Sequence, residues 1–229
     1  MTTEDQYRDI ASKVTNTVRQ YREEPLSNWK QVKKSNDVVV WTRPTTHSSG
    51  HLYKGESIIN ASLEEIFKFV GPWEESRRAQ WDKTIKLVEV VERPAEDMVV
   101  MRSVTHSYAM GTISPRDFID LISITQTEDE ICTSAISIEH PDFPVISDIV
   151  RGSNGPLGLC ITRIPGEPNK CKVVNFIHTD LSGKLPKTVT QKVFPSNIVD
   201  FYVQLRHALK KGIQHYHDKS AKSEEKSKS

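Results

Sequence analysis

The sequence contains no long hydrophobic run: no stretch approaches 18 consecutive apolar residues, the length at which a membrane-spanning helix is expected. The first six residues, Met-Thr-Thr-Glu-Asp-Gln, are acidic, whereas a secretory signal peptide begins basic and then becomes apolar. Thr2 stands where N-myristoylation needs a glycine, and the C-terminus has no prenylation motif. These absences predict a cytoplasmic protein without a lipid anchor.

The chain also lacks a strong excess of charge of either sign. Lys and Arg total 31 against 30 Asp and Glu, and this net charge of +1 argues against a general nucleic-acid binder. The charge is uneven along the chain, because residues 184–229 carry a net +6 and residues 1–183 carry −5. We therefore expect an anionic partner, such as a membrane surface, to be attracted to the C-terminal part.

Cysteine is scarce, with three residues in 229. Cys132, Cys160 and Cys171 are an odd number at wide spacing without a CxxC pair, which fits neither a disulfide framework nor a zinc site. The sequence therefore predicts buried free thiols in a reducing cytosol.

Motifs that bind cofactors or metals are missing as well. The glycine-rich stretch Gly152–Gly158 lacks the Gly-Lys-Ser/Thr ending of a phosphate loop, and Pro156 removes a backbone donor that such a loop would use. His215 and His217 lie two residues apart, so their side chains diverge by about 200° on a helix and make a poor joint metal site. We expect no cofactor and no metal.

Two acid and histidine pairs, Glu139 with His140 and His178 with Asp180, resemble fragments of an acid–base site. No nucleophile motif such as GxSxG accompanies either pair, and an isolated histidine on a strand is more often a surface or hydrogen-bonded residue. We therefore expect no enzyme and no catalytic residues. A hydrolase that uses one of these pairs remains an alternative.

Three segments have the periodicity of amphipathic helices. Residues 4–22 carry apolar side chains at helical spacing and end before Pro25. Ser62 and Glu65 have the form of a capping box, which starts a second helix. A long terminal helix is predicted from about residue 185, with Pro195 as a kink or break and an apolar stripe that includes Phe201.

Nine apolar runs bounded by turn residues have the character of strands. They lie at 29–33, 37–41, 51–59, 85–92, 98–107, 117–125, 130–139, 149–163 and 172–181. Their connections are too short for helical crossovers, so the order is mostly antiparallel and the fold class is α+β. We expect one domain over residues 1–217 and a disordered polar tail over 218–229.

Five motifs in this order resemble one family, the START lipid-binding domain, and in particular its short soluble subfamily that consists of this domain alone. They are Leu52-Tyr-Lys-Gly55, Trp81-Asp-Lys83, Ile113-Ser-Pro-Arg-Asp-Phe118, Val150-Arg-Gly-Ser-Asn-Gly-Pro156 and His178-Thr-Asp-Leu-Ser-Gly-Lys-Leu-Pro186. The resemblance covers residues 5–215. It implies a helix-grip fold, in which a curved antiparallel sheet of about nine strands wraps around the C-terminal helix and encloses an apolar tunnel.

The resemblance also implies gate loops at the mouth of the tunnel. The first contains Tyr108, Ala109, Met110, Gly111 and Ile113, and the second contains Gly183 and Leu185. Glycine lets the backbone bend, and methionine is apolar and flexible. Ordinary turns are the alternative interpretation of both loops.

Candidate cavity residues come from one strand and the terminal helix. Ser103, Thr105 and Ser107 share one strand face, and Phe201, Tyr202 and Leu205 would roof the space. Several sterol-binding members of the family carry an acidic residue and an arginine in the cavity, and the matching positions here are Ser103 and Ile122. A neutral contact from Ser103 or Thr105 is therefore expected instead.

The resemblance implies a monomeric carrier that takes up one sterol or sterol-like lipid (cholesterol, an oxysterol, a bile acid or a steroid) and moves it between membranes. Lys184, Lys187 and Lys192 would contact an anionic membrane briefly, and a solvated helix face is the alternative for them. A phospholipid or ceramide carrier is the first rival within the same fold. An interaction module with a collapsed tunnel is a rival of another class.

Overall fold

The computed structural model describes residues 3–35, 37–45, 51–73, 76–107, 111, 113–145, 149–183, 185 and 187–226, without the side chains of residues 187 and 213–226. Its helices are α1 (Glu4–Glu23), the 3-10 turn η1 (Leu26–Asn28), α2 (Leu63–Val70), α3 (Arg78–Trp81) and α4 (Lys187–Lys226). Its strands are β1 (Lys30–Ser35), β2 (Val38–Pro44), β3 (His51–Ile59), β4 (Ile85–Ala95), β5 (Met98–Thr105), β6 (Arg116–Gln126), β7 (Glu130–Ser137), β8 (Val150–Arg151), β9 (Ser153–Asn154), β10 (Leu157–Ile164), β11 (Glu167–Ile177) and β12 (Thr179–Asp180).

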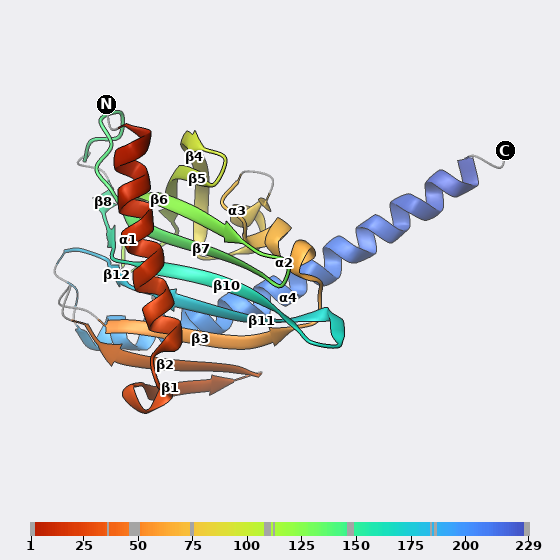
Figure 1. Cartoon of the computed structure of the whole chain (residues 1–229), viewed down its shortest axis with the longest axis horizontal. Coiled ribbons are helices and arrows are strands. Elements are labelled where there is room, and N and C mark those ends of the chain that lie inside the picture. Colours follow the sequence, from red (N-terminus) through yellow and green to blue (C-terminus); the bar gives the residue numbers. More distant parts are fainter. Residues whose placement is uncertain are drawn as a thin grey trace.

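A curved sheet forms the body of the molecule, with α1 on one face and α4 on the other (Figure 1). Nine strands follow one another in the order β1-β2-β3-β11-β10-β7-β6-β5-β4, and every neighbouring pair is antiparallel. The short strand β8 pairs in parallel with β6, and β9 pairs with β12 in a separate small sheet. The predicted α+β fold with nine antiparallel strands is confirmed.

Two predicted strands are divided in the structure. The run 149–163 becomes β8, β9 and β10, because the chain changes direction at its glycines and at Pro156, which cannot donate to a ladder. Residues 172–181 likewise form the end of β11 and the separate β12. These short pieces bring Asn154 and Thr179 together beside β6 and β7 of the main sheet.

The first helix covers the outer face of the sheet. Thr3 and Gln6 form a capping box, in which each side chain accepts a hydrogen bond from the other residue's backbone N–H. The buried stripe of α1 packs on strand residues such as Ile119 and Leu121. At the crossing with β10, a Cβ on Gly158 would lie 2.7 Å from Val18, so this close approach requires glycine.

The last helix covers the inner face. Ile198, Phe201, Tyr202 and Leu205 of α4 join the largest core cluster, which also contains residues of β2, β3, β10, β11 and α2. Helix α4 continues through Pro195 without interruption, where the sequence predicted a kink or break. Its C-terminal part projects away from the sheet (Figure 1). The predicted disordered tail overlaps this part, whose backbone is helical to Lys226, and the boundary at residue 217 stays a prediction.

Tyr202 fixes the position of α4 on the sheet. Its fully buried hydroxyl lies 3.0 Å from the Gly55 carbonyl, 3.1 Å from Asn175 Oδ1 and 3.2 Å from the Val173 carbonyl. A Cβ on Gly55 would lie 2.3 Å from Asn175 Oδ1 and 2.5 Å from Ile198. Glycine at position 55 therefore allows the helix to approach β3 closely. Burial raises the pKa of the tyrosine well above its usual value, so the hydroxyl stays a donor.

The prediction of three free thiols is wrong for two of them. Cys132 and Cys160 lie directly opposite each other in β7 and β10, with Cα atoms 4.1 Å apart, and form a disulfide. Antiparallel pairing brought two residues together that are 28 positions apart in the sequence. Cys171 is buried and free, as expected.

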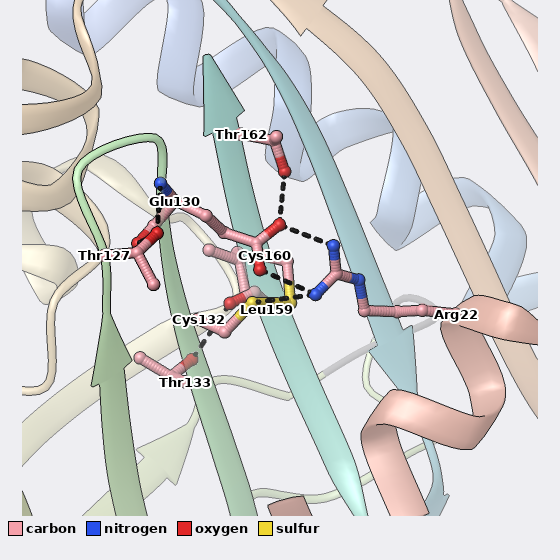
Figure 2. Close-up of a disulfide and its surroundings, with 8 residues drawn as sticks. All are labelled: Arg22, Thr127, Glu130, Cys132, Thr133, Leu159, Cys160 and Thr162. Atoms are coloured by element: carbon pink, nitrogen blue, oxygen red, sulfur yellow. Dashed lines mark hydrogen bonds and ion pairs between the residues drawn. A yellow bond between two sulfur atoms is a disulfide. The ribbon is translucent and has the colours of Figure 1, made fainter.

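An ion pair lies over the disulfide (Figure 2). Arg22 of α1 donates to Glu130 of β7 at 2.7 Å, and the same Nη1 atom lies 3.5 Å from Cys132 Sγ. Although burial raises it, hydrogen bonds from Arg22 and Thr162 leave the pKa of Glu130 below its usual value. The disulfide therefore lies between α1 and the sheet, beside a charged contact that joins them.

A buried polar network ties the small sheet to the main one. Asp120 of β6 accepts from Ser137 of β7 at 2.7 Å and from Asn154 of β9 at 2.9 Å. Thr179 of β12 donates to the Asn154 amide oxygen at 2.7 Å. Burial raises the pKa of Asp120 to about 6, although both hydrogen bonds act to lower it.

Loss of the disulfide is predicted to destabilise the fold. The Cys132→Ser/Cys160→Ser double variant removes a cross-link between residues 28 positions apart. In the chain-entropy treatment this loss lowers the free energy of unfolding by about 3–4 kcal/mol. Urea unfolding of the oxidised wild type and of this variant measures the difference. Reductant is expected to lower the midpoint of wild type and of the Cys171→Ala control but not that of the double variant. Insensitivity of wild type to reductant would contradict the prediction.

Titration of Asp120 is predicted to make stability depend on pH. Because its folded pKa is raised from 3.8 to about 6, the protonated form stabilises the fold below pH 3.8, and this contribution is lost as the pH rises through 6. Relative to Asp120→Asn, the free energy of unfolding of wild type should fall by up to about 3 kcal/mol between pH 4 and pH 7. If the free energies of unfolding of the two proteins change in parallel with pH, the pKa of Asp120 is not raised by folding.

Candidate functional site

A cavity of about 270 Å³ lies between the inner face of the sheet and α4. Its floor follows the alternation of the strands, because every second side chain points inward. The inward residues that line it include Met101, Ser103 and Thr105 of β5, Phe118, Asp120 and Ile122 of β6, Thr133 and Ala135 of β7, Leu157 and Leu159 of β10, and Asn175 and Ile177 of β11. Val193, Phe194, Asn197, Ile198 and Phe201 of α4 close the other side.

Most of this lining is apolar, and its few polar groups differ in how they are engaged. The Thr105 hydroxyl accepts a hydrogen bond from the Arg116 backbone N–H at 3.0 Å, and the Asn175 amide oxygen accepts from Tyr202. Among the described residues the Ser103 hydroxyl has no hydrogen-bonding partner. An alcohol or carbonyl group of a ligand would find Ser103 available.

Two carboxyl groups line the cavity in different settings. Asp82 forms an ion pair with Arg78 at 3.1 Å and accepts from Thr84, so its charge is balanced. Asp120 accepts only neutral donors, Ser137 and Asn154, and its pKa is raised to about 6 by burial. No sequence motif singles out Asp120. Asp120 alternates with Phe118 and Ile122 in one predicted strand, and this period of two indicates that the three side chains share the face that lines the cavity.

The predicted cavity residues divide into two groups. Ser103, Thr105 and Phe201 line the cavity. Ser107 lies beyond the end of β5, where the alternation has stopped, and is exposed. Tyr202 and Leu205 are fully buried and belong to the core between α4 and the strands, outside the cavity lining.

The two predicted gate loops meet beside the cavity. Tyr108, Ala109 and Met110 lie outside the described residues. Ile113 of the first loop is fully buried in a cluster with Phe118 and Leu181, and Leu185 of the second loop packs against that cluster. Gly111 and Gly183 have positive φ values of 87° and 79°, a conformation that favours glycine.

Arg116 connects these loops through its guanidinium group. Its side chain donates to the Leu181 carbonyl at 2.8 Å, to the Ser182 carbonyl at 3.3 Å and to the Ser114 hydroxyl at 2.8 Å. A guanidinium carries five donors in a fixed plane, so one side chain can hold both loops together. Movement of either loop would have to break part of this set.

Arg151 and Trp81, which belong to two of the family motifs, make contacts that hold the fold together. Arg151 makes a two-pronged contact with Asp117 at 2.9 and 3.0 Å, on the opposite face of β6 from Asp120. Trp81 donates to the Phe69 carbonyl at 3.2 Å and packs against Phe201.

The predicted membrane-contact lysines lie around the start of α4. Lys184 and the side chain of Lys187 lie outside the described residues. Lys192 is exposed. Within the part of the chain that the structure describes, no helix is long and apolar enough to cross a membrane, and no three His, Cys, Asp or Glu side chains are grouped so that they could hold a metal ion.

The residues of the alternative acid–histidine pairs lie outside the lining of the cavity. His140 lies 3.4 Å from Glu92, while Asp180 accepts from the Ser182 backbone N–H and His178 is buried. None of Glu139, His140, His178 and Asp180, all described residues, lines the cavity.

Comparison with known proteins agrees with this architecture. StAR-related lipid transfer protein 5 of Bos taurus is 40% identical over 203 residues, which cover 88% of this chain and 95% of that protein. StAR-related lipid transfer protein 4 of Homo sapiens is 30% identical over 204 residues, covering 87% and 96%. The solved structure of human StAR-related lipid transfer protein 5 matches with a TM-score of 0.85 and 36% identity, covering 91% of this chain and 98% of that one.

The family model described as the START domain matches residues 10–214, most of the chain. Together with relatives at 30–40% identity over nearly their full length, this match shows that the chain belongs to the START domain family.

Proposed function

We propose that this protein is an intracellular, monomeric lipid carrier that binds one sterol or sterol-like lipid and moves it between membranes. The observation that carries the proposal is the largely apolar cavity of about 270 Å³ under α4. The names of its relatives, StAR-related lipid transfer proteins 4 and 5, support lipid transfer.

The energetics favour a carrier with a closed site. A sterol-sized ligand hides about 400 Å² of apolar surface, a gross gain on the order of 10 kcal/mol at about 25 cal/mol per Å², before the cost of ordering. Such a ligand leaves the cavity only when the wall opens. Ile113 and Leu185, one from each predicted gate loop, pack in the cluster beside the cavity, and Arg116 holds the loops together.

The size of the cavity supports a compact ligand over a lipid with two acyl chains. Its volume is just below the range of about 300–1,000 Å³ that is usual for small-molecule sites. The ion pair Arg78–Asp82 is internally balanced, so it offers little to a charged headgroup. An open volume also argues against a collapsed interaction module, and the dispersed acid and histidine residues argue against a hydrolase.

Filling the cavity is predicted to abolish lipid binding. Ala135→Trp places an indole where a methyl group lines the cavity, so retention of a sterol from a mixed lipid extract should fall at least tenfold. Native mass spectrometry measures the mass and stoichiometry of what stays bound. The control is Val203→Trp on α4, where the side chain is 38% exposed. A phospholipid adduct on wild type would support the rival carrier, and no adduct would remove the support for transfer.

The lysines around the start of α4 are predicted to accelerate transfer from anionic membranes. Each lysine near such a surface contributes about 1 kcal/mol, so Lys184→Glu/Lys187→Glu should slow sterol transfer from anionic vesicles about tenfold or more at low salt. Transfer from neutral vesicles should change little. Lys30→Glu/Lys34→Glu on exposed positions of β1 makes the same change in charge and is the control. Equal rates for the two double variants would leave the solvated-face interpretation.

A further inference from the structure

Asp120 is an unusual group to find in an apolar cavity. It is the carboxyl group among the described lining residues that has no cationic partner, because Asp82 is paired with Arg78. Burial of a carboxylate without a counter-charge is costly, and this cost appears as the raised pKa of about 6. The network around Asp120 holds its orientation but does not neutralise it.

The hydrogen bonds of Asp120 leave room for one more donor. A carboxylate has about four lone-pair sites. One oxygen accepts from Ser137 and the other from Asn154, while Asn154 is itself held by Thr179. At least one lone pair thus remains for a donor that comes from the cavity.

A second polar group lies diagonally across the sheet from Asp120. Asp120 faces Met101 on β5, and Ser103 is the next inward residue on that strand, opposite Phe118. Diagonal neighbours on one face of antiparallel strands lie about 7–8 Å apart. Ile122 and Ala135 continue the wall as an apolar surface. Asp120 and Ser103 therefore form a polar corner beside this apolar surface, and such a corner suits the polar group of a lipid.

We propose that Asp120 accepts a hydrogen bond from a hydroxyl group of the bound lipid, and that it makes this cavity select sterol-like alcohols over the corresponding ketones. The proposal rests on the proposed function and names the polar group that its ligand carries. A ketone oxygen at this corner would face carboxylate oxygens with no hydrogen between them, so the desolvated acceptors would repel. An alcohol supplies the missing donor.

The test compares two probes that differ in this group alone, 5α-cholestan-3β-ol and 5α-cholestan-3-one, at pH 7.5. We expect wild type to bind the alcohol about tenfold more tightly than the ketone, because a hydrogen bond to a charged group is worth about 1.5–3 kcal/mol. In Asp120→Asn the amide can donate to the ketone, so the preference should disappear or reverse. Asp200→Asn, an exposed carboxylate on α4, should keep the wild-type ratio.

A pH series on wild type gives a second readout that needs no variant. An alcohol binds better to the ionised carboxylate and a ketone to the protonated acid, so the alcohol-to-ketone ratio should rise several-fold as the pH rises through 6. The other ionisable groups near Asp120 are paired or lie on the other face of the sheet. Arg78 and Asp82 in the cavity are paired, and Arg102, Asp117 and Arg151 cluster on the other face of the sheet. His178 alternates with Ile177 and Thr179, which line the cavity.

The outcomes separate this proposal from the function on which it rests. If wild type binds both probes equally well at every pH, or if Asp120→Asn keeps the preference for the alcohol, the selection by Asp120 is overturned and the carrier function stands. If neither probe binds to wild type, the sterol-carrier function fails and the proposal fails with it. If Asp120→Asn does not fold, the pH series on wild type decides alone.

Discussion

The contact between the Tyr202 hydroxyl and the inner strands, at 3.0–3.2 Å from three acceptors on β3 and β11, sets the distance between α4 and the sheet. Around it, Ile198 and Leu205 are buried in the core cluster that α4 shares with the strands. Further along the sheet, toward β5 and β6, the same helix stands off and Phe201 and Asn197 face open space. A cavity exists here because the helix is held tightly at one side of a curved sheet.

The cavity wall combines two incompatible requirements. An apolar lining is needed to bind a lipid, whereas the short strands β9 and β12 must be tied to the main sheet through polar groups, since two-residue strands bury little surface. The hydrogen bonds among Asp120, Asn154 and Thr179 tie the short strands to the main sheet, and these polar groups lie within the apolar lining. The result is a carboxyl group whose pKa is raised to about 6.

The outer face of the sheet has a different role. There α1, the disulfide between Cys132 and Cys160, and the Arg22–Glu130 ion pair join the middle strands to the first helix. None of these outer residues lines the cavity. The cross-links of α1 to the sheet therefore lie on the face opposite the cavity, whereas the contacts of Arg116 with Ser114, Leu181 and Ser182 lie beside it.

The sequence by itself determined the elements of this protein. Periodicity located α1, α2, α4 and the strands, and it placed Ser103, Thr105 and Phe201 on inward faces, because burial on one side imposes a local repeat of 2 or 3.6 residues. Five sequence motifs indicated the START domain family. Only the tertiary structure decided that Cys132 meets Cys160, that Ser107 lies outside the cavity and that Asp120 lacks a counter-charge. These outcomes depend on strand order, register and the ends of strands, which long-range packing sets and no local repeat encodes.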